Sequence, residues 1–244
     1  YQNAEEFYRA ENGHAIGYFW GYKTAGIFQN QQDINNWIAA GNGVMQSNVQ
    51  PGDVKYIDIN HDGVINANDK VDLGNGLPKY TFGFNFTLGY KGFDLSANFT
   101  GAAGFQIAQS YRDPSSSQAN YSRRILNRWT GEGTSNEIPR VTYGDVGNWL
   151  FSDLYLQDGD YIRLQNLTLG YDFKKLIAWK GLSKMRLYFQ VQNLFTLTKY
   201  DGMDPEIGSF NGTDGNSSDS WVSGVDMGYY PHPRTFIVGL NLAF

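Results

Sequence analysis

The strongest constraint on the fold is a regular alternation of apolar residues with polar or small ones. Over residues 80–90, every even position is apolar and every odd position is Thr, Gly or Asn. Because successive side chains of a β-strand point to opposite faces, this pattern predicts a strand with one apolar face and one polar face. A Lys91-Gly92 turn follows, and residues 93–100 resume the alternation. The two segments together predict a β-hairpin.

The same pattern returns in residues 185–192 and 235–244. In the last segment the apolar positions share one face, with Ile237 the one exception on the other face. A strand that faces lipid needs an apolar face along its whole length, whereas a soluble sheet has little reason to end on an exposed Phe244. Residues 161–171 alternate less regularly, and the change of phase at Gln165 and Asn166 predicts a β-bulge.

Composition agrees with an all-β membrane fold. The mean hydropathy is −0.46, and the chain contains no run of 18 apolar residues, which excludes a membrane-spanning helix. A transmembrane barrel alternates lipid-facing and lumen-facing residues, so its average hydropathy resembles that of a soluble protein. The net charge of −5 argues against nucleic-acid binding, and the absence of Cys excludes disulfides and thiol chemistry.

Six antiparallel strands are expected, at about 14–23, 80–90, 93–109, 161–171, 185–197 and 235–244. Long connections (24–79, 110–160 and 198–234) alternate with short ones (90–92 and 172–184). Bacterial barrels have long extracellular loops and short periplasmic turns, and the smallest have eight strands. We therefore expect the chain to be the C-terminal segment of a larger barrel, and the start at Tyr1 suggests a fragment.

Four separated motifs make the chain resemble SusC/RagA-type TonB-dependent transporters. They are the segments 17–29, 51–60, 74–80 and 192–206, in the order in which that family has them. The resemblance implies a 22-stranded barrel in the outer membrane of a Gram-negative bacterium that imports oligosaccharides or peptides. It also implies a plug domain, contact with TonB and a SusD-like surface lipoprotein as partner. The plug and the TonB box lie N-terminal to this segment in the family, so neither is expected in this chain.

Residues 58–69 fit a twelve-residue calcium loop. The expected ligands are Asp58, Asn60, Asp62, the carbonyl oxygen of Val64 and Asp69. Calcium requires several oxygen ligands at about 2.3–2.6 Å, and Gly63 permits the sharp turn that brings them together. The loop ends on Asp69 where an EF-hand usually has Glu. The alternative is an Asx-rich turn whose carboxylates accept hydrogen bonds from nearby backbone N–H groups.

Candidate substrate contacts are less specific. Arg186, Tyr188 and Gln190 are expected on the lumen-facing side of their strand, where most residues merely keep the lumen hydrated. Trp149 and Trp221, in extracellular loops, could stack on sugar rings or peptide side chains, or could pack the loops together and meet the lid protein.

Nothing in the sequence predicts an enzyme. Its three histidines, His14, His61 and His232, are far apart, and no nucleophile motif accompanies them. Asp204 and Glu206 form a carboxylate pair that a glycosidase would need, but a loop turn explains Asp204-Pro205-Glu206 better. His232, between two prolines, is expected to be a plain surface residue.

Two functional classes remain from the sequence. The chain is either part of an energised outer-membrane importer or a secreted, calcium-stabilised β-rich binding module whose apolar faces form a sandwich core. A sandwich keeps most of its connections short. The alternation of long and short connections therefore favours the importer.

Overall fold

The computed structural model describes residues 7–45, 48–110, 123–142, 147–177, 179–208 and 223–244. The chain divides into two compact units. The first unit comprises residues 1–77, 106–157 and 207–228, and the second comprises residues 78–105, 158–206 and 229–244. Among the described residues, no helix combines the length and the apolar character needed to cross a membrane.

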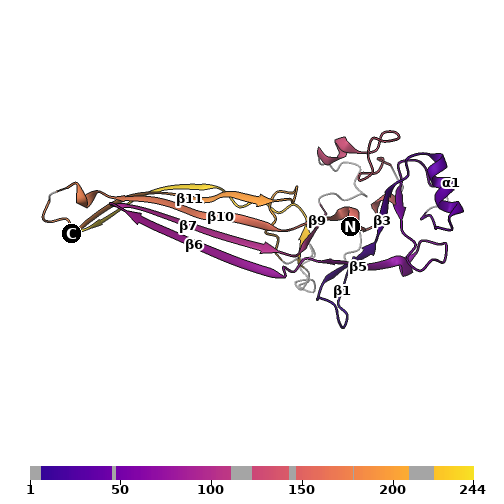
Figure 1. Cartoon of the computed structure of the whole chain (residues 1–244), viewed down its shortest axis with the longest axis horizontal. Coiled ribbons are helices and arrows are strands. Elements are labelled where there is room, and N and C mark those ends of the chain that lie inside the picture. Colours follow the sequence, from indigo (N-terminus) through magenta and orange to yellow (C-terminus); the bar gives the residue numbers. More distant parts are fainter. Residues whose placement is uncertain (1–6, 46–47, 111–122, 143–146, 178, 209–222) are drawn as a thin grey trace. The chain divides into compact units, whose positions relative to one another are not determined.

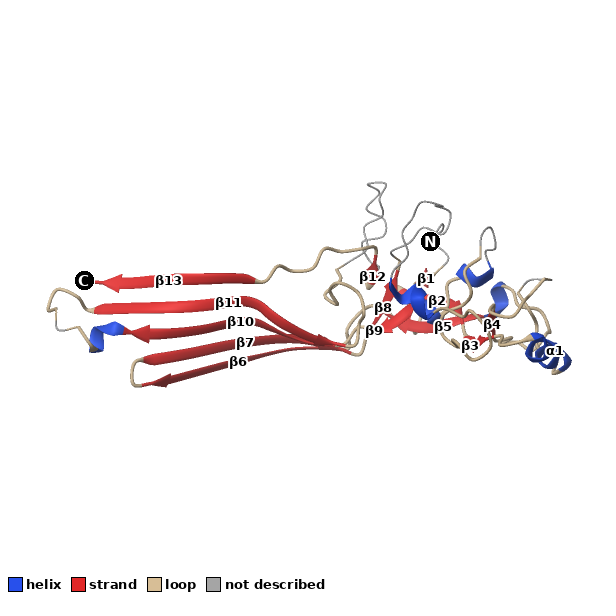
Figure 2. Ribbon diagram, turned by 90° about the horizontal axis from the view of Figure 1, so that it is seen from above, coloured by secondary structure: helices blue, strands red, loops and turns tan. Residues whose placement is uncertain are grey.

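The second unit is a five-stranded antiparallel sheet with the strand order β13-β11-β10-β7-β6 (Figure 2). Its strands are β6 (Tyr80–Tyr90), β7 (Phe93–Ala103), β10 (Tyr161–Asp172), β11 (Lys184–Thr198) and β13 (Thr235–Ala243). Four of the strands predicted from the sequence agree with these bounds to within one residue at each end. The sheet is open, with β6 and β13 as its edges, and the described residues contain no closed barrel.

Two local features of this sheet confirm predictions from the sequence. Lys91 and Gly92 have φ angles of 48° and 98°, and a two-residue hairpin loop of this type needs a positive φ at both positions. The pairing of β10 with both of its neighbours shifts register between Leu164 and Asn166, as expected for a bulge. Asn193 of β11 lies at the same level and also has a positive φ, 51°.

One face of the sheet is apolar across all five strands. A representative row of directly paired residues runs through Leu88, Leu95, Leu169, Phe189 and Val238. Four of these side chains are exposed, from 44% for Phe189 to 72% for Val238, and Leu95 on the inner strand β7 is partly buried. Exposed apolar area on this scale is unusual for a monomeric soluble protein and indicates a surface that contacts lipid or protein.

The opposite face is polar along the same strands. The adjacent row consists of Thr87, Ser96, Thr168, Gln190 and Ile237. Ile237 is the exception that the sequence also showed. The two faces differ as the period-2 pattern requires, because neighbouring residues of a strand lie on opposite sides of the sheet.

The described residues of the first unit form three small sheets (Figures 1 and 2). One has the order β1-β2-β5, formed by β1 (Tyr8–Arg9), β2 (Tyr18–Tyr22) and β5 (Lys70–Asn75). A second pairs β3 (Thr24–Ile27) with β4 (Val54–Tyr56). The third has the order β12-β8-β9, formed by β8 (Gln106–Gln109), β9 (Leu156–Asp158) and β12 (Val225–Asp226), with β12 parallel to β8.

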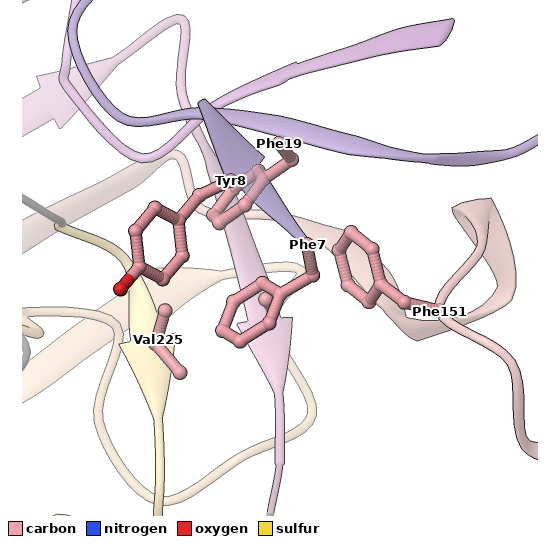
Figure 3. Packing of buried hydrophobic residues seen from close by; sticks show 6 residues of the cluster. Phe7, Tyr8, Phe19, Phe151 and Val225 are labelled. Carbon is pink, nitrogen blue, oxygen red and sulfur yellow. The ribbon is translucent and has the colours of Figure 1, made fainter. Parts of the chain in front are cut away.

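Aromatic side chains form the core of the first unit. Phe7, Tyr8, Phe19, Phe151 and Val225 pack together although they come from segments far apart in the chain (Figure 3). The ring centroids of Phe7 and Phe151 lie 5.0 Å apart. Burying such large side chains stabilises the unit, because each removes roughly 150–250 Å² from water.

The helices of the first unit are short. Helix α1 (Gln31–Ala39) begins after Asn30, whose side-chain oxygen accepts a hydrogen bond of 2.9 Å from the backbone N–H of Asp33. Single turns of 3-10 helix occur at η2 (Ala67–Asp69), η4 (Gly147–Trp149) and η5 (Asp153–Tyr155), with a slightly longer one at η3 (Arg123–Asn127). In the second unit, η6 (Phe173–Lys175) follows β10.

Two strands differ from those predicted. Residues 14–23 were expected in the barrel wall, but β2 pairs with β1 and β5 in the first unit. Its consecutive aromatics are covered on both faces, with Tyr18 and Phe19 only 1% and 0% exposed. The strand predicted at 93–109 ends at Ala103, because Gly104 turns the chain with a φ of 78°. Residues 106–109 continue as β8 of a different sheet.

Candidate functional site

An ion cluster with a buried centre lies on the polar face of the second unit, where β10 and β11 meet the segment that follows β11 and the segment that precedes β13. Arg163 lies on β10, paired with Thr100 and Thr196, and its Nε donates a 3.0 Å hydrogen bond to the hydroxyl of Thr196. Its Nη1 donates to Glu206 at 2.8 Å, and its Nη2 donates to Asp204. The side chains of Arg163 and Asp204 are only 4% and 6% exposed.

Asp204 is the acceptor at the centre of this cluster. Its Oδ1 accepts from the backbone N–H of Glu206 at 3.0 Å, and its Oδ2 accepts from the backbone N–H of His232 at 3.1 Å. Nδ1 of His232 lies 2.9 Å from the same Oδ2. Burial raises the pKa of Asp204, but these hydrogen bonds and the charge of Arg163 outweigh burial, so the pKa lies below its ordinary value.

The cluster borders a cavity of about 230 Å³. Arg163, Asp204, His232 and Arg234 contribute its charged and titratable lining, alongside smaller and apolar residues such as Thr196 and Met203. Arg234 is exposed. A cavity of this size holds several water molecules or one small polar group, because a water molecule takes about 30 Å³ in the liquid.

This cluster was not predicted from the sequence. The prediction of a turn at Asp204-Pro205-Glu206 named two of its members but gave them no ion-pair partner. His232 was expected to be a plain surface residue, yet its half-exposed ring lies against the carboxylate of Asp204. No sequence pattern linked Arg163 to Asp204 or His232, because Arg163 and Asp204 are about 40 residues apart and Asp204 and His232 are about 30 residues apart. Only the fold brings the three side chains together.

Asp204, Glu206 and His232 also place one ligand atom each within 4.8 Å of one another. No other group of three acidic, histidine or cysteine side chains in the described part of the chain converges in this way. The guanidinium of Arg163 already satisfies both carboxylates, and a positive charge there opposes a cation. The arrangement therefore acts as a structural ion cluster that pins two loop segments to the polar face.

The predicted contacts Arg186, Tyr188 and Gln190 do lie together on the polar face of β11. Each of them contacts another residue of the sheet. Arg186 forms a bidentate ion pair with Asp94, with distances of 2.8 and 2.5 Å, and its guanidinium lies 4.8 Å from the ring centroid of Tyr188. Gln190 donates to Asn166 at 3.2 Å. These contacts hold the side chains along the sheet.

The structure describes one of the two tryptophans that were predicted to contact substrate. Trp149 ends η4 in the first unit, where it is half-buried. Trp221 lies outside the described residues. The substrate assignment of all five candidates therefore stays a prediction.

The calcium loop predicted at residues 58–69 forms a tight turn. Asp58 accepts hydrogen bonds from the backbone N–H groups of Asp62 and Gly63 at 3.3 and 2.7 Å. Asp69 accepts from the N–H groups of Ile59 and Asn66 at 3.0 and 2.7 Å. The carboxylates thus close the turn, as in the Asx-turn alternative.

The other predicted ligands of this loop are more exposed. Asp62 accepts from the N–H of Val64 at 2.9 Å, and Asn60 donates to Asp62 at 2.9 Å. The carboxylates of Asp58, Asp62 and Asp69 do not converge as a set of three. Calcium binding stays a prediction.

Sequence relatives cover almost the whole chain. TonB-dependent receptor P3 of Formosa agariphila is 34% identical over 234 residues, which are 95% of this chain and 22% of that protein. TonB-dependent receptor SusC of Bacteroides thetaiotaomicron is 29% identical over 205 residues, which are 82% of this chain and 18% of SusC. No protein-family model matches the chain.

Solved structures show the same fold. The structure of the RagAB peptide transporter matches 99% of this chain and 24% of the transporter chain, with a TM-score of 0.68 and 20% identity. The closed-closed state of the RagAB peptide importer matches with a TM-score of 0.66 and 20% identity.

The chain spans about a quarter of the length of the relatives that it matches. Those relatives are outer-membrane proteins of a transporter family that is non-enzymatic, as expected from the sequence. The chain is therefore homologous to one segment of the SusC/RagA-type TonB-dependent receptors.

Proposed function

We propose that this chain forms part of the wall of a TonB-dependent importer in the outer membrane of a Gram-negative bacterium. The observation that carries the proposal is the five-stranded sheet whose one face is apolar and exposed while the other is polar. A transmembrane barrel requires this division, because its outer face contacts lipid and its inner face contacts a hydrated lumen. Strands β6 and β13 then pair with strands outside this sheet.

Strand length supports the membrane assignment. β6 has 11 residues. A rise of about 3.3 Å per residue and a tilt of about 40° carry such a strand across about 25 Å, the height of the apolar band of outer-membrane barrels. In the relatives' architecture the barrel would have 22 strands, long extracellular loops and an N-terminal plug that contacts TonB.

A SusD-like surface lipoprotein is the proposed partner on the extracellular side. The support is that the matched solved structures are RagAB complexes and that one sequence relative is SusC. The proposed cargo is an oligosaccharide or a peptide, hydrated solutes that suit the polar face. RagAB is described as a peptide transporter.

Uptake by the whole receptor tests this function. Cells that produce the receptor should accumulate a fluorescent oligosaccharide or peptide library only with intact TonB, and a TonB-box deletion is the matched control. Accumulation that is independent of TonB would contradict the importer. A secreted, water-soluble product would favour the alternative, a calcium-stabilised binding module.

We also propose that the loop of residues 58–69 binds calcium and stiffens an extracellular loop. Its support is burial: Asp58 and Asp69 are 1% and 0% exposed, and within the described residues neither forms an ion pair with Lys, Arg or His. Buried charges are normally paired or coordinate a metal. In this assignment Asp62, Asn60 and the Val64 carbonyl complete the oxygen set.

Calorimetric titration of the whole receptor with calcium tests this site. One calcium ion should bind to the wild type and none to Asp62→Ala at the same concentration, while Asp72→Ala, outside the loop, should bind like the wild type. Heat of binding unchanged in Asp62→Ala would restore the Asx turn.

A further inference from the structure

We infer that the short-turn end of the five-stranded sheet binds the anionic headgroups of phospholipids in the periplasmic leaflet, through Lys91, Lys180 and Lys184. The inference rests on the proposed function, which places these turns at the periplasmic surface. Its partner is a phospholipid with a negatively charged phosphate group.

The charge of this end is opposite to that of the chain. Residues 172–184 contain four lysines and one aspartate, a net formal charge of +3, although the chain as a whole carries −5. Lys91 adds a positive charge in the neighbouring turn. The two connections lie at the same end of the sheet (Figure 2), and the backbone N–H of Asp172 donates to the carbonyl oxygen of Gly92 at 2.8 Å.

The acidic groups beside these lysines are already engaged. Asp94 is paired with Arg186. Asp172 accepts from the backbone N–H groups of Lys174 and Met185 at 3.0 and 3.4 Å. In contrast, Lys91, Lys180 and Lys184 are exposed, and none of them forms an ion pair within the described residues. Lys91 Nζ lies 5.1 Å from the ring centroid of Tyr90, a contact that leaves its charge without a counter-ion.

Apolar side chains next to the lysines suit an interface between lipid and water. Leu176 and Trp179 are 70% and 58% exposed. Lys174 holds their turn in place, since its Nζ donates to the carbonyl oxygen of Trp179 at 2.7 Å. The ring of Trp179 meets that of Phe244 edge-on, with centroids 5.9 Å apart. Trp prefers the headgroup level of a membrane, because its ring is apolar and its N–H is polar.

Lys180 follows Trp179 directly, and Lys184 begins β11. Their ammonium groups therefore lie just beyond the apolar band, at the depth of the lipid phosphates. Each lysine near an anionic membrane surface favours binding about fivefold. We expect the receptor to prefer an anionic phospholipid over a zwitterionic one at this turn.

Fluorescence quenching of Trp179 measures that preference. The whole receptor is reconstituted into vesicles with equal mole fractions of brominated phosphatidylglycerol or brominated phosphatidylcholine. The signal of a Trp179→Phe variant is subtracted to isolate Trp179. Phosphatidylglycerol should quench Trp179 more strongly, and the preference should fall about fivefold for each lysine removed in Lys180→Gln/Lys184→Gln.

The matched control is Lys79→Gln/Lys199→Gln, which removes the same charge from exposed lysines at the other end of the same sheet. It should keep the preference. High salt should abolish the preference in the wild type, a test that needs no substitution and holds even where a variant fails to assemble.

Equal quenching of wild-type Trp179 by the two lipids overturns the inference and leaves the barrel intact. The same holds for a preference that survives in Lys180→Gln/Lys184→Gln. If neither lipid quenches Trp179, and the electrophoretic mobility of the protein does not change on heating as that of a folded outer-membrane barrel does, the proposed function itself fails.

Discussion

Replacing Phe84 with Arg should impair assembly far more than the same change at its neighbour Asn85. Both residues are exposed and adjacent on β6. Phe84 belongs to the apolar face, opposite Phe99, whereas Asn85 belongs to the polar face, opposite Asn98. In the proposed barrel only the first change puts a charge into lipid.

The magnitude follows from depth. Asn85 is the central residue of β6, and one residue corresponds to about 2.5 Å along the membrane normal at the expected tilt. Phe84 therefore lies close to the midplane, where an Arg costs about 2–4 kcal/mol. Because 1.4 kcal/mol corresponds to a tenfold change in an equilibrium constant, Phe84→Arg should shift the folding equilibrium toward the unfolded state by about 30- to 700-fold. Asn85→Arg loses a hydrogen bond from Asn98, worth about 1 kcal/mol.

The assay is the assembled fraction of the whole receptor, measured by heat-modifiable electrophoretic mobility after folding into lipid vesicles over a urea series. Phe84→Leu is the control that keeps the position apolar. Similar losses for Phe84→Arg and Asn85→Arg would mean that protein covers both faces, as in a sandwich, and would refute the membrane assignment.

Three further outcomes are expected. Arg163→Met should lower the free energy of unfolding by about 3–5 kcal/mol, because it leaves the buried carboxylate of Asp204 without its cation; a urea titration that shows no change would contradict this. Since the folded-state pKa of Asp204 lies below its ordinary value, the cluster stabilises the protein above the ordinary aspartate pKa of about 3.9, and this stability is lost as the pH falls through the lower, folded-state pKa. The gap in melting temperature between wild type and Asp204→Asn should therefore narrow in strong acid, and a constant gap would count against the lowered pKa. With calcium present, residues 24–79 should be cleaved faster by a protease in Asp62→Ala than in the wild type, whereas without calcium the two should be cleaved at the same rate, and both should keep their heat-modifiable mobility. Equal cleavage of the wild type with and without calcium would contradict calcium binding by the loop.

The sheet of the second unit could be predicted almost completely from the sequence. A period-2 pattern with one apolar face determines which side each residue takes, and a one-residue slip would reverse the faces. That is why β6 and its turn at Lys91-Gly92 were predicted to the residue, and why the phase change at Gln165 marked the bulge.

The first unit was harder to predict because its strands do not have one buried face and one exposed face, as β2 shows. β2 is buried on both faces, so its aromatic run carried no information about which sheet it joins. Helix α1 was missed within a predicted loop, since eight of its nine residues are not buried and only Ile34 is. Its apolar residues Ile34, Trp37 and Ile38 do follow the i, i+3, i+4 spacing of a helix, but this pattern covers only nine residues inside a long segment that was predicted to be a loop.

The ion cluster around Arg163 depends on contacts that sequence reasoning could not supply. Asp204 and Glu206 are local to one another, but their cation lies on β10 and their histidine lies just before β13. The predicted calcium loop differs, because all of its candidate ligands lie within twelve consecutive residues and their spacing can be seen in the sequence. The same spacing also suits an Asx turn in which the carboxylates accept hydrogen bonds from backbone N–H groups, so the spacing alone does not distinguish the two.

Alternating accessibility along β11 tests the central claim most directly. This chain contains no Cys, and single cysteines at Leu187, Tyr188, Phe189 and Gln190 can be labelled selectively in a version of the whole receptor from which any other Cys has been removed. In vesicles, a charged, water-soluble maleimide should react at positions 188 and 190 but not at positions 187 and 189, because maleimide adds to a thiolate and a thiol that faces lipid stays protonated. All four positions should react after denaturation. Equal labelling of the four positions in vesicles would contradict a sheet with one face in lipid and the other in water.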